Sequence, residues 1–276
     1  MDALRQIDDW PAAHNAAGVA TADAVVVERG DVEHRFGWGS VTKLLVAYAT
    51  LVAAEEGAVD LDEPAGPEGS TVRHLLAHAS GLAWDSVVPL GQPGERRVYS
   101  NSGYVVLAAH VEARTEIPFA TYLGEAVLAP LGLEATLEGD AAGGMVGNLG
   151  DMLRFGREAL APTLIAPETL AEAISVQFPG IDGVLPGFGR QTPNHWGLGF
   201  ELRDAKSPHW TGSRNSPQTY GHFGSKPGTA TFLWIDPAVG LICAALADKS
   251  FGDWARAAWP ALSDAVLSEG SRAAAG

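Results

Sequence analysis

Strand-like patterns occupy both ends of the chain, and helical patterns fill its middle. Residues 2–10 have the apolar spacing of a short amphipathic helix. Val19 to Glu28 then form a β-like run, Arg29-Gly30-Asp31 is a turn sequence, and Val32 to Phe36 form a second short run. Two such runs around a turn predict a β-hairpin. We expect this hairpin to lead directly into the next element.

That element is an apolar run from Leu44 to Ala54, which continues through two glutamates to Gly57. Glycine after a periodic segment is typical of a helix end. The run is too short to span a bilayer and is bounded by charged residues. It therefore predicts a buried core helix.

Between this helix and about residue 178, apolar residues recur at three- and four-residue spacing, which predicts helices. The segments are Val72–Ala79 (with Ser70 or Thr71 as its cap), Ser102–Glu116, Pro118–Ala129, Asp151–Leu160 and Pro167–Val176. Strand character returns afterwards and is followed by a closing amphipathic helix. These segments are Trp196–Leu202, Thr229–Ile235, Val239–Leu246 and the helix Phe251–Leu267.

The order of these elements indicates how the fold is assembled. Strands come first, then the buried helix, the helical block, more strands and a last helix. One sheet must therefore be built from both ends of the chain around a helical insertion, which is an α+β plan. Residues 59–70 are rich in turn-forming residues and mark a crossing point between lobes.

Composition narrows the class of partner. The 276 residues carry a formal net charge of −15, which argues against nucleic acid or anionic membranes, because both need clustered Lys and Arg. The only cysteine, Cys243, lies in an apolar run and predicts an inert core thiol. The N-terminus lacks a basic segment followed by an apolar one, so we expect a cytoplasmic protein.

The start of the buried helix carries the first candidate chemistry. Ser40 and Lys43 are three residues apart, which places them on one helix face. The helix dipole and burial both favour a neutral amine there, and a neutral amine beside a hydroxyl is a general base beside a nucleophile. The alternative is an N-terminal serine and a solvated lysine, since such a pair arises by chance about once in a chain this long.

Two further stretches could complete a site. In Tyr99-Ser100-Asn101, the tyrosine could share proton transfer with Lys43 and the asparagine could donate to a substrate amide. Gly221 to Lys226 lie just ahead of the predicted strand Thr229–Ile235 and form its glycine-flanked edge, whose N–H groups, with that of Ser40, could form an oxyanion hole. The alternatives are an ordinary helix cap and a glycine-rich hairpin with a surface histidine.

The three stretches together resemble the S-x-x-K, Tyr-x-Asn and K-T-G pattern of serine β-lactamases and penicillin-binding proteins. The chain is similar to the class C β-lactamase and D-alanyl-D-alanine carboxypeptidase family, including its esterase-like members. Family-like segments follow in order over roughly residues 19–265. They include Arg35 to Lys43, His74 to Leu82, Pro93-Gly94 before Tyr99, Ala142 to Phe155, Trp196 to Gly199 and Gly221 to Pro237.

The resemblance implies a two-lobed β-lactamase or penicillin-binding-protein fold. Residues 1–60 and 181–276 would form a lobe with an antiparallel sheet of about five strands flanked by helices. Residues 61–180 would form an inserted all-helical lobe, and the active site would lie in the cleft between the lobes.

The resemblance also implies catalytic roles. Ser40 would attack a substrate carbonyl, while Lys43 with Tyr99 would remove the serine proton and later protonate the leaving group. No metal and no organic cofactor would be needed. His74 and His78 have the spacing of zinc ligands, but Leu75 stands where His-Glu-x-x-His needs glutamate, so we expect core or hinge histidines.

Substrate contacts would come from the remaining motif residues. The N–H group of Ser225 would help hold the oxyanion, and Asn101 with the strand beyond Gly224 would orient the acyl chain. His222 would assist the tyrosine or contact substrate, and Lys226 could pair with a substrate carboxylate.

One departure bears on the reaction. The family's K-T-G lysine is His222 here, as in its esterase-like and peptidase-like members. We therefore expect a serine hydrolase acting on a small-molecule ester, amide or lactam through an acyl-enzyme, with esterase or peptidase ranked above β-lactamase. The alternative is a catalytically silent module that binds a peptide or lactam-like ligand. G-x-S-x-G is not met at Ser40, which excludes an α/β-hydrolase elbow there.

Overall fold

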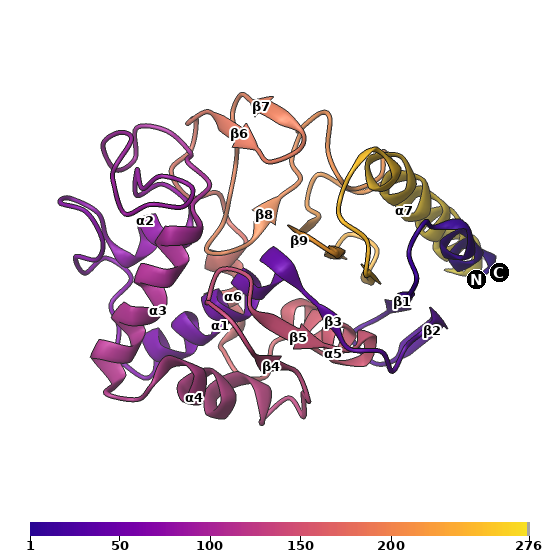
Figure 1. Ribbon diagram of the computed structural model, residues 1–276, viewed down its shortest axis with the longest axis horizontal. Helices are drawn as coiled ribbons and strands as arrows, with labels where there is room; N and C mark the ends of the chain where they lie inside the picture. Colours follow the sequence, from indigo (N-terminus) through magenta and orange to yellow (C-terminus); the bar gives the residue numbers. More distant parts are fainter. Residues whose placement is uncertain (275–276) are drawn as a thin grey trace.

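The computed structural model describes residues 1–274 (Figure 1). Its largest sheet is antiparallel and has six strands. The strand order is β2-β1-β11-β10-β9-β8, so strands from both ends of the chain lie side by side. The α+β prediction is confirmed, with one strand more than the five expected. The strands are β1 Asn15–Ala20, β2 Val25–Gly30, β8 Glu201–Leu202, β9 Tyr220–Lys226, β10 Thr229–Asp236 and β11 Leu241–Ala247.

The predicted first hairpin has its turn in the wrong place. The run Val19–Glu28 is not one strand, because the chain turns between Ala20 and Val25, which face each other in the register. The N–H of Thr21 donates to the carbonyl of Ala24 at 2.9 Å and closes this turn. The second predicted run is largely a loop, and only its end enters β3, Phe36–Gly37. β3 pairs with β5, Met145–Gly147, which in turn pairs with β4, Thr136–Leu137.

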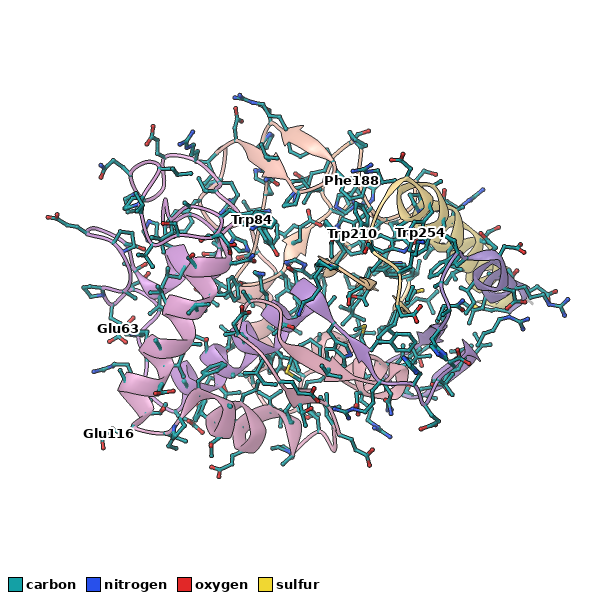
Figure 2. The ribbon with its side chains drawn as sticks, viewed as in Figure 1. Glu63, Trp84, Glu116, Phe188, Trp210 and Trp254 are labelled. Atoms are coloured by element: carbon teal, nitrogen blue, oxygen red, sulfur yellow. The ribbon has the colours of Figure 1, made fainter. Side chains whose placement is uncertain are left out.

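Both faces of the central sheet are buried, which explains the near-continuous apolar sequence of β11. Alternate side chains of a strand point to opposite faces. Cys243 and Ala245 belong to a core shared with η1 (Asp2–Asp9) and α7 (Asp253–Ala274), whereas Ile242 and Ala244 belong to the core under α5 (Leu149–Leu160) and α1 (Thr42–Glu55). Figure 2 shows Phe188, Trp210 and Trp254 in the region near α7.

The helices of the middle segment gather on the side away from α7 (Figure 1). The predicted helices are found, with shorter bounds in three cases. They are α2 Val72–Leu76, α3 Asn101–Thr115, α4 Phe119–Leu123 with the π-helical η3 Gly124–Leu128, and α6 Pro167–Ala173. α2 ends early because His78, two residues beyond it, has a left-handed φ of 54°. None of the helices in residues 1–274 is long and apolar enough to cross a membrane.

α5 joins the middle segment to the sheet. Its Gly156 lies so close to β11 that a Cβ there would be 2.7 Å from Ile242 Cγ2. This helix falls within residues 61–180, the predicted all-helical lobe, yet it packs on the sheet. The division into lobes at these residue numbers stays a prediction.

Two strand predictions near the site differ from the structure. Trp196–Leu202 forms a strand only at its last two residues, because the chain first bends through Gly197 and Gly199. Conversely, the glycine-rich stretch around His222 is itself the strand β9. Glycine and histidine are poor indicators of a strand, and β9 gains its stability from pairing with β10 along its whole length.

Candidate active site

The position of Ser40 is fixed by close backbone packing against β9. Ser40 lies in the short 3₁₀ segment η2, Gly39–Val41, just before α1. The carbonyl of Trp38 accepts a 2.8 Å hydrogen bond from Thr231 Oγ1, which ties η2 to β10. A Cβ at Gly224 would lie 2.0 Å from that carbonyl, so only glycine permits the approach. The serine is therefore held at the edge of the sheet.

Lys43 lies one turn further on, and its amine is completely buried. Its Nζ is 3.1 Å from Ser40 Oγ, 2.8 Å from Asn101 Oδ1 and 2.6 Å from the carbonyl oxygen of Ala142. Removal from water lowers the pKa of the Lys43 amine from 10.5 to about 7. A large fraction of the molecules therefore carries a neutral amine near neutral pH.

The contacts of this amine orient its lone pair. In the neutral form, Lys43 has two N–H groups and one lone pair. The oxygens of Asn101 and Ala142 can only accept hydrogen bonds from it, so they take the two N–H groups. The lone pair is then left for the hydroxyl of Ser40. The arrangement can therefore act as a general base on the serine proton.

Tyr99 lies on the other side of Ser40 and is backed by His222. The imidazole Nδ1 donates to the carbonyl of Phe223 at 2.6 Å, so Nε2 accepts from the Tyr99 hydroxyl at 3.3 Å. Burial lowers the pKa of His222 to about 3, and burial raises the pKa of Tyr99 above its usual 10 against the effect of a hydrogen bond with Ser40. Both groups are neutral at pH 7, and Tyr99 is a proton donor rather than a base.

His78 supports Tyr99 from behind. Its ring centroid is 4.3 Å from that of Tyr99, and its Nδ1 accepts the backbone N–H of Ser100 at 3.1 Å. His74 instead closes a capping box with Thr71 at the start of α2. Both histidines thus have structural partners of the kind expected from the sequence.

The remaining predicted residues surround the same site. The amide nitrogen of Ser225 on β9 lies close to Gly39. A Cβ added at Gly39 would be 3.0 Å from this nitrogen. Ser225 and Ser40 line one pocket. Asn101 begins α3 and contacts the Lys43 amine, whereas the exposed Lys226 donates to the Gly143 carbonyl at 2.8 Å. The structure therefore gathers these residues around the serine, and their roles toward a substrate stay predictions.

The pocket in front of Ser40 is mostly apolar and measures about 610 Å³, including its opening to solvent. The motif residues Ser40, Tyr99, His222 and Ser225 form one side. Phe223 comes from the same stretch as His222 and Ser225, and Trp196 begins the family-like segment Trp196 to Gly199. The other walls come from segments in which the sequence shows no catalytic motif. They are Trp84, Leu185, Pro186, Gly187, Glu201, Phe251 and Arg256.

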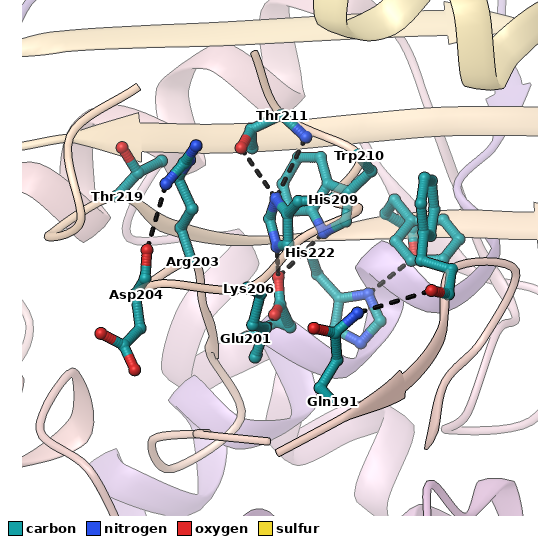
Figure 3. A network of polar contacts seen from close by, with 12 residues as sticks. Gln191, Glu201, Arg203, Asp204, Lys206, His209, Trp210, Thr211, Thr219 and His222 are labelled. Atoms are coloured by element: carbon teal, nitrogen blue, oxygen red, sulfur yellow. Dashed lines mark hydrogen bonds and ion pairs between the residues drawn. The ribbon is translucent and has the colours of Figure 1, made fainter. Parts of the chain in front are cut away.

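A buried ionic cluster stands behind this wall (Figure 3). Glu201 forms an ion pair with Lys206 and accepts hydrogen bonds from His209 Nε2 and Trp210 Nε1, both at 2.8 Å. Burial acts to raise the pKa of the Glu201 carboxyl, but its contacts with His209 and Lys206 outweigh burial and lower that pKa to about 2. Lys206 also lies 5.6 Å from the ring of Trp196 and so fixes the pocket wall.

Comparison with known proteins identifies the family of this chain. The sequence model of the family described as Beta-lactamase matches residues 7–139 and 134–267, which is most of the chain. The chain belongs to the beta-lactamase family. The similar solved structures include proteins described as a beta-lactamase, a penicillin-binding protein homologue and a hydrolase, and this chain shares their fold.

Three similar proteins illustrate the range of the family. A crystal structure of a beta-lactamase from Mycobacterium bovis is 50% identical, with a TM-score of 0.94 over 97% of this chain and 99% of that one. Penicillin-binding protein 4* of Bacillus subtilis is 28% identical over an alignment of 134 residues, and the match covers 37% of this chain and 30% of that protein. EstCE1, a hydrolase with promiscuous acyltransferase activity, is 18% identical, with a TM-score of 0.77 and 96% of each chain covered, and shows the fold alone.

Proposed function

We propose that the protein is a serine hydrolase that cleaves a small ester, amide or lactam through an acyl-enzyme on Ser40. The observation that carries this proposal is the buried Lys43 amine, 3.1 Å from the serine hydroxyl and with a pKa lowered to about 7. The oxygens of Asn101 and Ala142 accept the two N–H groups of the neutral amine, so its lone pair is free to accept the serine proton. A merely structural lysine has no reason to be buried without a carboxylate partner.

In the first half-reaction, Ser40 Oγ attacks the substrate carbonyl carbon while its proton passes to Lys43 Nζ. The carbonyl oxygen becomes an oxyanion, which the N–H groups of Ser40 and Ser225 stabilise. The bond to the leaving group then breaks, and the leaving group takes a proton either directly from the Lys43 ammonium or from the phenol of Tyr99, which the Lys43 ammonium then reprotonates. On either route the Lys43 amine ends the half-reaction neutral. His222 holds the phenol through its Nε2.

In the second half-reaction, water attacks the acyl-enzyme carbonyl, and the neutral Lys43 amine accepts a proton from that water. The N–H groups of Ser40 and Ser225 stabilise the new oxyanion as they did the first one. Collapse of this intermediate releases the acid and returns a proton to Ser40 Oγ. Atoms and protons therefore balance with water as the only co-substrate.

We rank esters and small peptides above β-lactams. A histidine with a pKa of about 3 stands at the strand position where the β-lactamase pattern has a charged lysine, so His222 supplies no positive charge to a lactam carboxylate. The Mycobacterium bovis relative is nevertheless described as a beta-lactamase, so a β-lactam belongs among the substrates to be tested.

Intact-protein mass spectrometry tests the proposal directly. Wild type and Ser40→Ala are incubated with a fluorophosphonate, an activated short-chain ester and a cephalosporin. We expect an adduct on wild type only, and turnover of the ester exceeding turnover of the cephalosporin. A folded wild-type protein that forms no adduct with any reagent would instead favour the silent ligand-binding module.

A further inference from the structure

A second cavity adjoins the pocket of the nucleophile. It measures about 1040 Å³, including its opening to solvent, and we call it the arginine groove. Trp84, Tyr99 and Pro186 line both the groove and the pocket, so the two cavities adjoin at these three side chains. An arm of a substrate bonded to Ser40 in the pocket would reach the groove past them.

The walls of the arginine groove are apolar and unusually exposed. The side chains of Trp84, Leu90 and Val184 are 48%, 55% and 59% exposed, respectively. They line the groove together with Val98 and Pro186. Apolar side chains gathered in a concave surface beside a reactive group are typical of a ligand site. These walls fit an aliphatic or aromatic chain.

The charged residues of the groove oppose the charge of the whole protein. The chain has 33 acidic and only 18 basic residues. The groove nevertheless has three arginines, Arg96, Arg97 and Arg190, and a single acid, Asp182, which is paired with Arg190 at 2.7 Å. An excess of positive charge in a cavity of an acidic protein attracts an anion.

Arg97 is the most informative of the three. Its side chain is buried, with 2% of the residue exposed, and it donates to the carbonyl oxygens of Ala77, Asn194 and Gln177 at 2.5, 3.0 and 2.8 Å. Within residues 1–274 no carboxylate pairs with this guanidinium. Burial lowers its pKa to about 9, which leaves it charged at neutral pH. A buried cation balanced only by neutral dipoles stabilises an anion placed beside it.

We propose that the arginine groove binds an apolar acyl arm that ends in a carboxylate, so that the preferred substrates are anionic esters or amides. The chain of the arm would lie along Trp84 and Val184, and its carboxylate would meet Arg96 and Arg190 at the rim. The proposal deepens the function proposed above and rests on it for the reaction, although binding itself does not require catalysis.

The binding half is tested by calorimetry with unreactive ligands. Octanoate and octanamide have the same chain and differ in charge. We expect octanoate to bind wild type more tightly, on the order of fivefold or more, because charge-assisted contacts add to the same apolar burial. Arg96→Glu with Arg190→Glu should abolish or reverse the preference. Arg5→Glu, an equally exposed arginine on η1, is the matched control and should leave it unchanged.

The substrate half is tested by kinetics. The mono-4-nitrophenyl ester of octanedioic acid is compared with the same ester whose far carboxyl is a primary amide. Wild type should show a higher kcat/KM for the anionic ester, and the double variant should lose that preference while its rate on 4-nitrophenyl acetate stays near wild type. Arg97→Met, checked for folding by circular dichroism, should also weaken the preference.

The outcomes separate the two proposals. An equal or stronger binding of octanamide to wild type would overturn the arginine-groove proposal, even if esters are hydrolysed. An octanoate preference that needs the arginines, in a protein that hydrolyses neither ester, would support the groove and refute the hydrolase. If Arg5→Glu changes the octanoate preference as much as the double variant does, the preference reflects general surface charge. That result would overturn the arginine-groove proposal.

Discussion

At the scale of single residues, the role proposed for Lys43 predicts how the activity should depend on pH. In the proposed mechanism only the neutral amine accepts the serine proton, and the pKa of this amine is lowered to about 7. We therefore expect kcat/KM for an ester to rise with pH and to reach half its maximum near pH 7. His222, with a pKa of about 3, should add no second step between pH 5 and 9. A profile that falls as pH rises through 7 would contradict this role for Lys43.

The same amine should make the folded protein less stable. The unfolded lysine keeps its proton up to about pH 10.5, whereas the folded one loses it near pH 7, so folding in that window releases a proton and stability rises with pH. At pH 7 we expect Lys43→Met to abolish activity and to raise the free energy of unfolding by about 1–3 kcal/mol. Urea unfolding measures this, with the exposed Lys226→Met as a control expected to change little.

The contribution of Tyr99 to kcat/KM should be larger for substrates whose leaving group must be protonated. Because burial raises its pKa, the phenol donates rather than accepts. Tyr99→Phe should lower kcat/KM for an alkyl ester or amide by about 10²-fold, within the usual range for general acids. A 4-nitrophenyl ester, which leaves as a stable anion, should lose less than about tenfold on the same scale. Equal losses for both substrates would assign the tyrosine a purely structural role.

At the scale of elements, the contact between η2 and β9 positions Ser40, the proposed nucleophile. A Cβ at residue 224 would lie 2.0 Å from the Trp38 carbonyl and 2.5 Å from Thr231 Oγ1, so Gly224→Ala must move η2 away from the sheet. We expect a loss of about 1–3 kcal/mol in unfolding free energy and a lower kcat. Gly124→Ala is the control, because its Cβ meets nothing within 4 Å and its backbone is helical. Thermal unfolding and ester kinetics of the two variants make the comparison.

The elements also show which parts of the structure could be predicted from the sequence. Ser40 and Lys43 were predictable because helix periodicity is local, and the capping of α2 by Thr71 follows the same logic. The first hairpin was misplaced because valines on both sides of the turn, such as Val19 and Val25, read as one continuous run. β9 escaped prediction because its stability comes from pairing with β10, which no local pattern records.

At the scale of the whole molecule, buried imidazoles should make the fold sensitive to acid. Burial lowers the pKa values of His78, His209 and His222 in the folded state. Below about pH 6.5 these histidines therefore bind protons in the unfolded chain but stay neutral in the folded chain. We expect the free energy of unfolding to fall steadily as pH decreases from 6.5 toward 4. His222→Gln should flatten this slope in urea titrations at several pH values, whereas His14→Gln, at an exposed position, should not.

The pocket walls belong to the same scale and could not be read from the sequence. Leu185 and Trp196 lie in one stretch of the sequence and Phe251 in a distant one, and they meet only in the folded chain. Arg96 and Arg97 are adjacent, whereas Arg190, on the same groove, belongs to a separate part of the sequence. Motifs thus predicted residues that the structure gathers around Ser40, whereas the surfaces that would select a substrate depend on long-range packing.

The sheet joins the two ends of the chain, and this has a consequence for biosynthesis. β1 pairs with β11, and the N–H of His14 donates to Asp248, 234 residues further along. At about 5–20 residues per second, a ribosome adds that length in roughly ten seconds or more, and β1 must wait for its partner during that time. During this time β1 and β2, with the exposed Val25 and Val26, are not yet part of the complete sheet. Chaperones that shield nascent strands should therefore determine the yield of this protein more than its final stability does.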